Sequence, residues 1–89
     1  MAWTIEFDEQ AQRELARLDK PIQLEISRYL DDRIAPSANP KAFGHPLGHE
    51  LSGLWRYRVR DYRILCEIQD KKLSVLVVSI GHRSKVYKH

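Results

Sequence analysis

The chain has 89 residues, of which 43% are hydrophobic and 30% charged, and its net charge is +3 at pH 7. This length corresponds to one small domain, residues 1–89, with a thin hydrophobic core. The composition is too apolar for a disordered segment and contains no long uncharged span, so we expect a folded protein that does not cross a membrane.

The first predicted elements are a strand and a helix that follow each other directly. Apolar and polar residues alternate over residues 3–7, which is the period of a half-buried strand. Asp8 is then a predicted N-cap. Apolar residues recur at helical spacing from Phe7 to Leu18, which predicts the first helix.

A second helix and a long loop are predicted next. Lys20 and Pro21 interrupt the first helix, and proline at a first helical position favours a new helix. Its apolar face comprises Ile22, Ile26, Leu30 and Ile34. Residues 36–53 contain three prolines and three glycines, so we expect an ordered loop there rather than a regular element.

The remaining chain is predicted to form a three-stranded antiparallel meander. In the segment WRYRVRDYRILCEIQ, one face carries Trp55, Tyr57 and Val59, and the other carries Arg56, Arg58 and Arg60. Asp61 marks a tight turn, residues 70–72 a second one, and residues 73–80 read as a central strand. The predicted fold is therefore α+β: an N-terminal strand, a helical hairpin and the meander, with the helices on one face of the sheet.

Charge is divided unevenly between the two halves of the chain. Residues 1–40 contain five Lys or Arg against eight Asp or Glu, whereas residues 41–89 contain ten against four. A basic half of this kind indicates a polyanionic partner. The alternative is two solvated faces that differ only in the sign of their net charge.

Two further features concern the compartment. The first ten residues have no basic stretch followed by an apolar run, so no secretory signal is predicted. Cys66 is the only cysteine, which excludes an internal disulfide and is typical of a reducing compartment. We therefore expect a cytoplasmic location.

Three arginines of the meander are predicted to converge on a phosphate-binding face. Side chains two residues apart on a strand lie about 7 Å apart on one face, so Arg56 and Arg58 match successive phosphates of one nucleic-acid strand. The hairpin brings Arg63 beside them if its register keeps the apolar faces together. Guanidinium groups suit phosphate oxygens. A face that merely keeps an edge hairpin soluble is the alternative.

The stretch GHRSKVYKH at the end carries groups that move protons or bind phosphate. Breaking an RNA phosphodiester requires a base for the 2′-hydroxyl proton, an acid for the departing 5′-oxygen and cations for the pentavalent phosphate. His82 titrates near neutrality and suits either proton role. Arg83 adds a cation, and Tyr87 lies far enough along the chain to fold back over the arginines. A surface histidine and a packed tyrosine are the alternatives.

Neither a metal nor a cofactor is predicted. His45 and His49 are four residues apart, but Pro46 and Gly48 between them argue against a helical metal pair. No cysteine or carboxylate pair nearby completes such a site. The expected chemistry therefore depends on the side chains of the protein alone.

Three segments together resemble a known family. WTIEFDEQAQRELARLD near the start, LWRYRVRDYRILCEI in the meander and VVSIGHRSKVY near the end are similar to the RelE branch of the RelE/ParE toxin superfamily. The resemblance covers essentially the whole chain. It implies a compact α+β toxin that enters the ribosomal A site and cleaves the mRNA there. It also implies a RelB-like antitoxin, the ribosome with its rRNA, and mRNA as partners.

The resemblance implies RNA-binding roles for basic residues. Arg56 and Arg58 fall where RelE toxins place the basic strand residues that grip the mRNA backbone. Both are arginine here rather than lysine. Arg60 and Lys85 are assigned to RNA binding with them.

Catalytic roles are implied for four residues. Arg63 matches the arginine that contacts the scissile phosphate, and Arg83 matches a catalytic arginine of the C-terminal motif. Tyr87 matches the tyrosine that stacks on the cut nucleotide or assists proton transfer. His82 stands where relatives have lysine or histidine, and it is the candidate acid or base.

Two other functions use some of the same features. ParE-like proteins share the fold but inhibit DNA gyrase, and a non-catalytic nucleic-acid-binding module would need only the arginines. Arg63, Arg83 and Tyr87 together favour RNA cleavage, because a gyrase inhibitor has no need of all three. The sequence thus predicts a metal-independent endoribonuclease of the mRNA interferase type.

Overall fold

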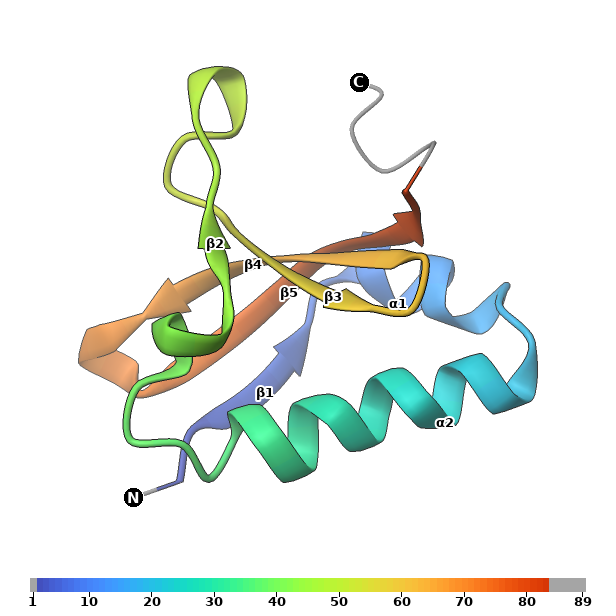
Figure 1. Ribbon diagram of the computed structural model, residues 1–89, viewed down its shortest axis with the longest axis horizontal. Helices are drawn as coiled ribbons and strands as arrows, with labels where there is room; N and C mark the ends of the chain where they lie inside the picture. Colours follow the sequence, from blue (N-terminus) through green and yellow to red (C-terminus); the bar gives the residue numbers. More distant parts are fainter. Residues whose placement is uncertain (1, 84–89) are drawn as a thin grey trace.

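In the computed structural model, which describes residues 2–83, two helices lie on one face of a five-stranded sheet (Figure 1). The strands are β1 (Thr4–Phe7), β2 (His45–Pro46), β3 (Trp55–Val59), β4 (Tyr62–Gln69) and β5 (Ser74–His82), in the sheet order β1-β5-β4-β3-β2. The helices are α1 (Glu9–Ala16) and α2 (Lys20–Tyr29). The predicted α+β fold and its meander are confirmed.

β5 is the central strand of the sheet. It pairs antiparallel with β4 over its whole length and parallel with β1, where Thr4 lies opposite Ser74 and Phe7 opposite Val77. β1 therefore accompanies only the first part of β5. The rest of β5 extends past the end of β1 toward α1.

Local sequence signals define both helices. Asp8 caps α1 as predicted, since its carboxylate accepts a hydrogen bond of 2.8 Å from the backbone N–H of Ala11. Pro21 lies in the first turn of α2, which continues into a π-helical turn at Leu30–Ile34. Its apolar residues recur every four positions rather than every 3.6, and the wider final turn keeps Ile34 buried. No helix within residues 2–83 is long and apolar enough to span a bilayer.

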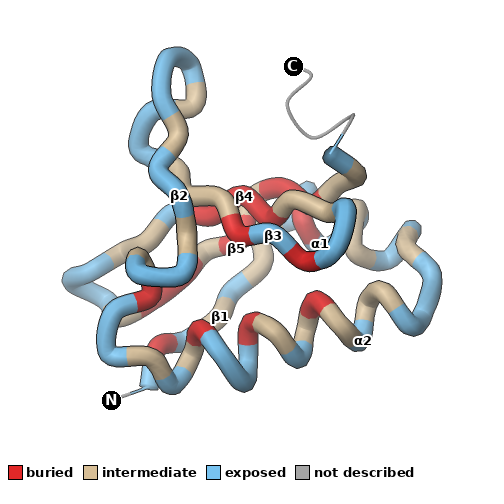
Figure 2. The backbone as a smooth tube through the Cα atoms, viewed as in Figure 1, coloured by how far each residue is buried: buried red, intermediate tan, exposed pale blue. Residues whose placement is uncertain are grey.

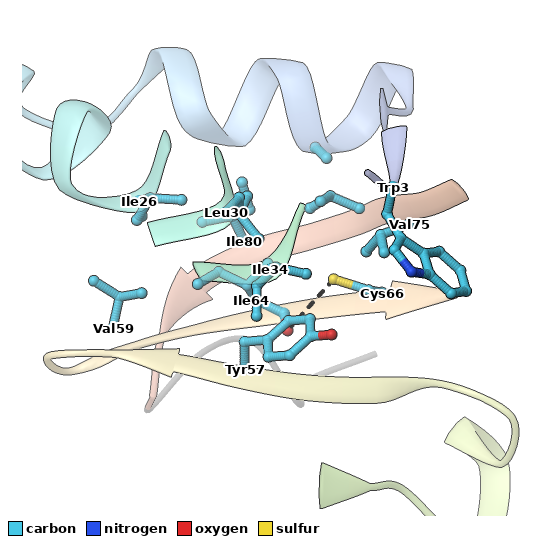
Figure 3. Close-up of a cluster of buried hydrophobic side chains, with 12 residues drawn as sticks. Trp3, Ile26, Leu30, Ile34, Tyr57, Val59, Ile64, Cys66, Val75 and Ile80 are labelled. Carbon is cyan, nitrogen blue, oxygen red and sulfur yellow. Dashed lines mark hydrogen bonds between the residues drawn. The ribbon is translucent and has the colours of Figure 1, made fainter. Parts of the chain in front are cut away.

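The core lies between the helices and the sheet (Figures 2 and 3). Its fully buried members include Ile26, Leu30, Ile34, Tyr57, Ile64, Cys66, Val75 and Val77. Burial raises the pKa of the Cys66 thiol, so this cysteine is a core residue rather than a reactive one. The buried hydroxyl of Tyr57 donates a hydrogen bond of 2.8 Å to the carbonyl oxygen of Pro40. This bond joins the segment between α2 and β3 to the sheet.

The segment of residues 36–53, predicted to contain no regular element, includes the two-residue strand β2. His45 lies opposite Arg56 and Pro46 opposite Trp55, which makes β2 the edge of the sheet. Proline lacks an N–H group and is tolerated in sheets mainly at such an edge. A strand of two residues produces no visible alternation in the sequence, which is why the prediction missed it.

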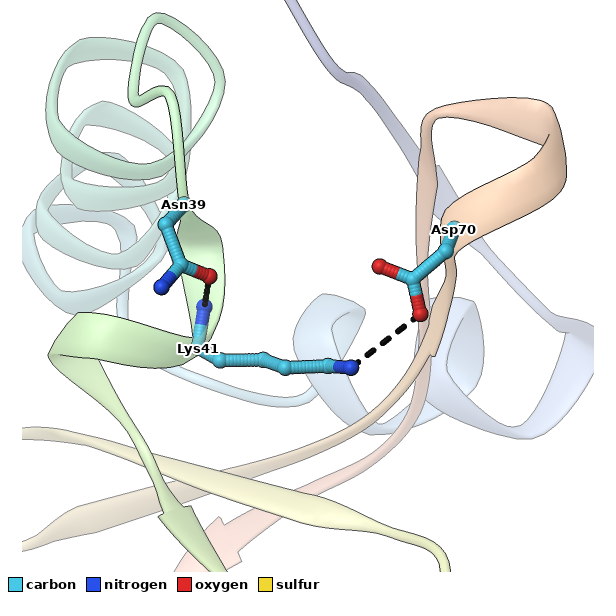
Figure 4. A network of polar contacts seen from close by, with 3 residues as sticks. All are labelled: Asn39, Lys41 and Asp70. Carbon is cyan, nitrogen blue, oxygen red and sulfur yellow. Dashed lines mark hydrogen bonds and ion pairs between the residues drawn. The ribbon is translucent and has the colours of Figure 1, made fainter.

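The start of this segment is also joined to the turn between β4 and β5 (Figure 4). The side-chain oxygen of Asn39 accepts a hydrogen bond of 3.2 Å from the backbone N–H of Lys41, and the ammonium of Lys41 lies 3.1 Å from a carboxylate oxygen of Asp70. This ion pair is exposed and contributes little stability. Residues 47–54 then extend away from the sheet on the side opposite α2 (Figure 1).

Candidate nucleic-acid interface

The β3–β4 hairpin places three arginines on the outer face of the sheet. Tyr57 lies opposite Ile64, and both are fully buried toward the helices. The next pair of the hairpin is Arg58 opposite Arg63, and Arg56 is two residues before Arg58 on β3. Because side chains alternate along a strand, all three arginines point away from the helices. The predicted register of the hairpin is confirmed.

The burial of these arginines differs. Arg58 is exposed, whereas Arg56 and Arg63 are half-buried. The Nη1 atom of Arg63 is buried and has no hydrogen-bond partner among residues 2–83. A buried guanidinium N–H without an acceptor costs free energy that an anionic oxygen would recover. A phosphate oxygen bound at this atom would supply such an acceptor.

Arg60, predicted on the same face, is directed elsewhere. It lies in the tight turn after β3 with a left-handed φ of 55°. Its Nε donates a hydrogen bond of 2.6 Å to a carboxylate oxygen of Glu25 on α2. This hydrogen bond lowers the pKa of the Glu25 carboxyl below its ordinary value. The turn conformation interrupts the strand alternation, so Arg60 reaches toward the helices instead of joining the outer face.

Arg83 follows the end of β5 on the side of the arginines. Arg63 lies opposite Gly81, and the backbone N–H of Arg83 donates a hydrogen bond of 2.8 Å to the carbonyl oxygen of Asp61. This bond extends the β4–β5 ladder by one step. Two residues after Gly81, the exposed Arg83 falls on the face of Arg63. We call Arg56, Arg58, Arg63 and Arg83 the arginine face.

His82 lies on the opposite side of the sheet. It is the last residue of β5 rather than part of a loop, and it lies opposite Tyr62. The two rings meet edge to face with their centroids 5.8 Å apart. His82 lines a pocket of about 340 Å³ together with Glu14, Arg17, Leu18, Tyr62, Ile80 and Gly81. Strand alternation therefore directs the four arginines to one face of the sheet, whereas the histidine ring lies on the helix side.

Sequence reasoning missed Glu14, which lies on α1 in the same pocket. One of its carboxylate oxygens accepts hydrogen bonds from the Ser79 hydroxyl and the Ile80 backbone N–H. A signal for this role was present, since Glu14 is spaced three residues after Ala11 and four before Leu18, on the apolar face of the helix. An acid in that position requires a buried partner.

Two predicted site residues, Lys85 and Tyr87, lie outside the described residues, so their roles stay predictions. Within the described part of the chain, no group of three or more His, Cys, Asp or Glu is placed to hold a metal ion. The cationic groups that β3 and β4 direct to the outer face are guanidinium groups.

The fold and its basic outer face define the class of protein. The family model described as ParE toxin of type II toxin-antitoxin system, parDE, matches residues 5–87. The chain therefore belongs to the RelE/ParE superfamily of type II toxins, as its sequence resemblance predicted.

The relatives by sequence are RelE-type toxins. Toxin RelG of Mycobacterium tuberculosis (strain ATCC 25618 / H37Rv) is 30% identical over 88 residues, which are 99% of each chain. Toxin RelE of the same strain is 32% identical over 78 residues, 88% of this chain and 78% of that one.

Solved structures of such toxins share the fold. The toxin-antitoxin complex RelBE2 from Mycobacterium tuberculosis includes a chain with a TM-score of 0.85 and 27% identity, covering 96% of this chain and 95% of that one. The isolated E. coli RelE toxin has a TM-score of 0.73 at 24% identity, covering 91% and 84%, and this likeness concerns the fold alone.

Proposed function

We propose that the chain is a ribosome-dependent endoribonuclease that cleaves mRNA in the A site and thereby inhibits translation. The observation that supports this proposal is the arginine face, in which Arg63 lies opposite Gly81 and Arg83 follows two residues later, beyond the end of β5. Arg56 and Arg58, spaced for successive phosphates, lie beside them. Curated relatives named RelG and RelE support cleavage over gyrase inhibition.

The proposed reaction is an internal transesterification of RNA. The 2′-oxygen forms a bond to the adjacent phosphorus as the bond from phosphorus to the 5′-oxygen breaks. A base takes the 2′-hydroxyl proton, and an acid gives a proton to the departing 5′-oxygen. The products are a 2′,3′-cyclic phosphate and a 5′-hydroxyl. Arg63 and Arg83 would donate hydrogen bonds to the phosphate oxygens, whose negative charge grows at the pentavalent stage.

Proton transfer is proposed for His82 and Tyr87. His82 is the last residue of β5 and directly precedes Arg83, so the two side chains lie on opposite faces at the same end of the strand. An RNA strand bound at Arg83 would have to bend around the end of β5 to reach that ring. Tyr87, four residues after Arg83, is the second candidate.

The ribosome is proposed as the source of most of the reactive geometry. A domain of this size has little surface with which to orient RNA, and orientation accounts for a large share of such rate enhancements. We expect the purified chain to cleave mRNA in stalled ribosomes at least about 10²-fold faster than naked mRNA. Single-turnover assays on both substrates measure this, and end analysis of the products should find a 5′-hydroxyl.

Comparable rates on both substrates, or a product with a 5′-phosphate, would contradict the proposed function. The same preparation should be incubated with DNA gyrase and supercoiled DNA as a control. DNA breakage without mRNA cleavage would favour the ParE-like function instead. Binding of RNA without either reaction would favour the non-catalytic module.

We infer that a RelB-like antitoxin covers the arginine face. Two of the related structures are toxin-antitoxin complexes, RelBE2 from Mycobacterium tuberculosis and RelBE from E. coli. The basic half of this chain, residues 41–89, would attract an acidic helical segment that folds as it binds.

Addition of the cognate antitoxin is expected to abolish mRNA cleavage and to slow hydrogen exchange along β3 and β4, since a bound segment would shield the arginine face. Exchange mass spectrometry of the complex against the toxin alone measures this. An antitoxin that protects only α1 and α2 and leaves cleavage intact would contradict this model of inhibition.

A further inference from the structure

The second part of β5 lacks a strand on one of its edges. β1 ends opposite Val77, where the backbone N–H of Asp8 donates a hydrogen bond of 3.0 Å to the Val77 carbonyl oxygen. The chain then turns away into α1. Beyond Val77, β5 has β4 on one edge and none of the other strands within residues 2–83 on the other. Backbone N–H groups on that edge need other acceptors.

Glu14 of α1 supplies such an acceptor. Its Oε1 atom accepts a hydrogen bond of 2.8 Å from the backbone N–H of Ile80 and one of 3.1 Å from the hydroxyl of Ser79. Ser79 is 5% exposed and Ile80 2%, so water has little access to either donor. The carboxylate takes the place of a strand carbonyl, and charge-assisted bonds of this kind are the stronger ones.

The contact falls on a β-bulge. Leu65 lies opposite Ser79, whereas Cys66 lies opposite Val77, so Val78 is an additional residue in β5. A bulge adds one residue to a strand and redirects the side chains that follow it. Glu14 therefore binds β5 immediately after the irregular position.

The bulge decides which residue at the end of β5 joins the arginine face. Counting by twos from Val77, which is buried on the helix side, a regular strand would direct His82 outward and Arg83 toward the helices. The additional residue reverses this order. Ile80 and His82 face the helices, and Arg83 falls on the side of Arg63. A slip of one residue would exchange the two side chains.

We propose that Glu14 is a positioning residue that holds the β5 bulge and so keeps Arg83, rather than His82, on the arginine face. The inference rests on the proposed function, because Arg83 is assigned there to the scissile phosphate. Glu14 lines the pocket on the helix side and acts through the backbone of β5. Within residues 2–83, the bond from the Arg83 N–H to Asp61 is the last of the ladder, so we expect it to depend most on that support.

Cleavage by Glu14 variants tests the proposal. Glu14→Ala removes both hydrogen bonds and is expected to slow single-turnover cleavage on the ribosome by about 10-fold or more, because a small displacement of a catalytic group is costly. Ribosome affinity should change by less than about twofold, since the arginines remain. Glu14→Gln keeps an acceptor oxygen and should recover most of the rate. Glu9→Ala, an exposed acid on the same helix, is the matched control.

A double-mutant cycle separates positioning from general destabilisation. If Glu14 acts through Arg83, Glu14→Ala should have little further effect on cleavage in the Arg83→Ala background. A full additional 10-fold loss there would overturn the inference.

An NMR measurement decides the positioning role whether or not the chain cleaves RNA. In Glu14→Ala, the Arg83 amide should exchange at least about tenfold faster and the His82 ring resonances should shift, while amides of the β1–β5 pairing stay protected. Unchanged Arg83 exchange, or equal acceleration throughout the sheet, would overturn the inference. If Glu14→Ala does not fold, Glu14→Gln replaces it, with about threefold faster Arg83 exchange expected from its neutral acceptor. Failure of the wild type to cleave would reject the proposed function and leave this result standing.

Discussion

Arg83→Ala is expected to slow the cut within the ribosome-bound complex by about 10²- to 10⁴-fold, the usual range for a lost transition-state contact. Arg83 is exposed at the end of the β4–β5 ladder on the side of Arg63. Its guanidinium can stabilise the charge that develops on the phosphate. Ribosome binding should be weakened much less, because Arg56 and Arg58 remain. Single-turnover cleavage at saturating ribosome separates the two effects.

Lys72→Ala is the matched control for the loss of one positive charge. Lys72 is exposed in the turn before β5, at the opposite end of that strand from Arg83. Its replacement should leave the cleavage rate within about twofold, as for surface charges far from the reaction. Full cleavage and full growth inhibition by Arg83→Ala would show that the catalytic assignment is wrong. Gyrase inhibition or RNA binding without cleavage would then become the better explanation.

Much of the fold and of the arginine face could be predicted because short-range rules determine them. Asp8 is followed by apolar residues at helical spacing, so the start of α1 follows from capping alone. The hairpin register follows from alternation and a two-residue turn, since a slip of one residue would bury arginines. The position of Arg63 opposite Arg58 is a consequence of these two rules.

The parts that could not be predicted depend on local departures from regular geometry. The face of His82 depends on the additional residue Val78, which no pattern in an apolar strand reveals. Arg60 leaves the outer face because its left-handed turn conformation turns it toward Glu25. The spacing of Glu14 indicates a buried partner, but the identity of that partner depends on the tertiary contact between α1 and β5. In each case, the sequence shows the residue but does not show which neighbour determines the direction of its side chain.

Arg63→Ala is expected to impair both binding and cleavage. Its half-buried guanidinium has one buried nitrogen without a partner among residues 2–83, so a phosphate oxygen bound there would be held in the ground state and in the transition state alike. We expect the cut to slow by about 10²- to 10³-fold, as when one donor to a developing oxyanion is removed. Affinity for the ribosome complex should also fall, and the plot of log affinity against log salt concentration should become less steep, its slope falling in magnitude by about 1.

Arg63→Lys separates the charge of Arg63 from its shape. Lysine keeps the positive charge but not the planar pair of donors, so it should restore the salt dependence and most of the affinity while the cut stays slow. Folding should tolerate Arg63→Ala, because Arg63 lies directly opposite Arg58 and like charges in that arrangement are unfavourable. Arg63→Lys keeps this pair of like charges and should leave folding unchanged. Thermal unfolding of each variant checks this. A loss confined to affinity would make Arg63 a backbone contact of the same kind as Arg58. Arg83 would then be the only arginine of the described chain left to stabilise the pentavalent phosphate.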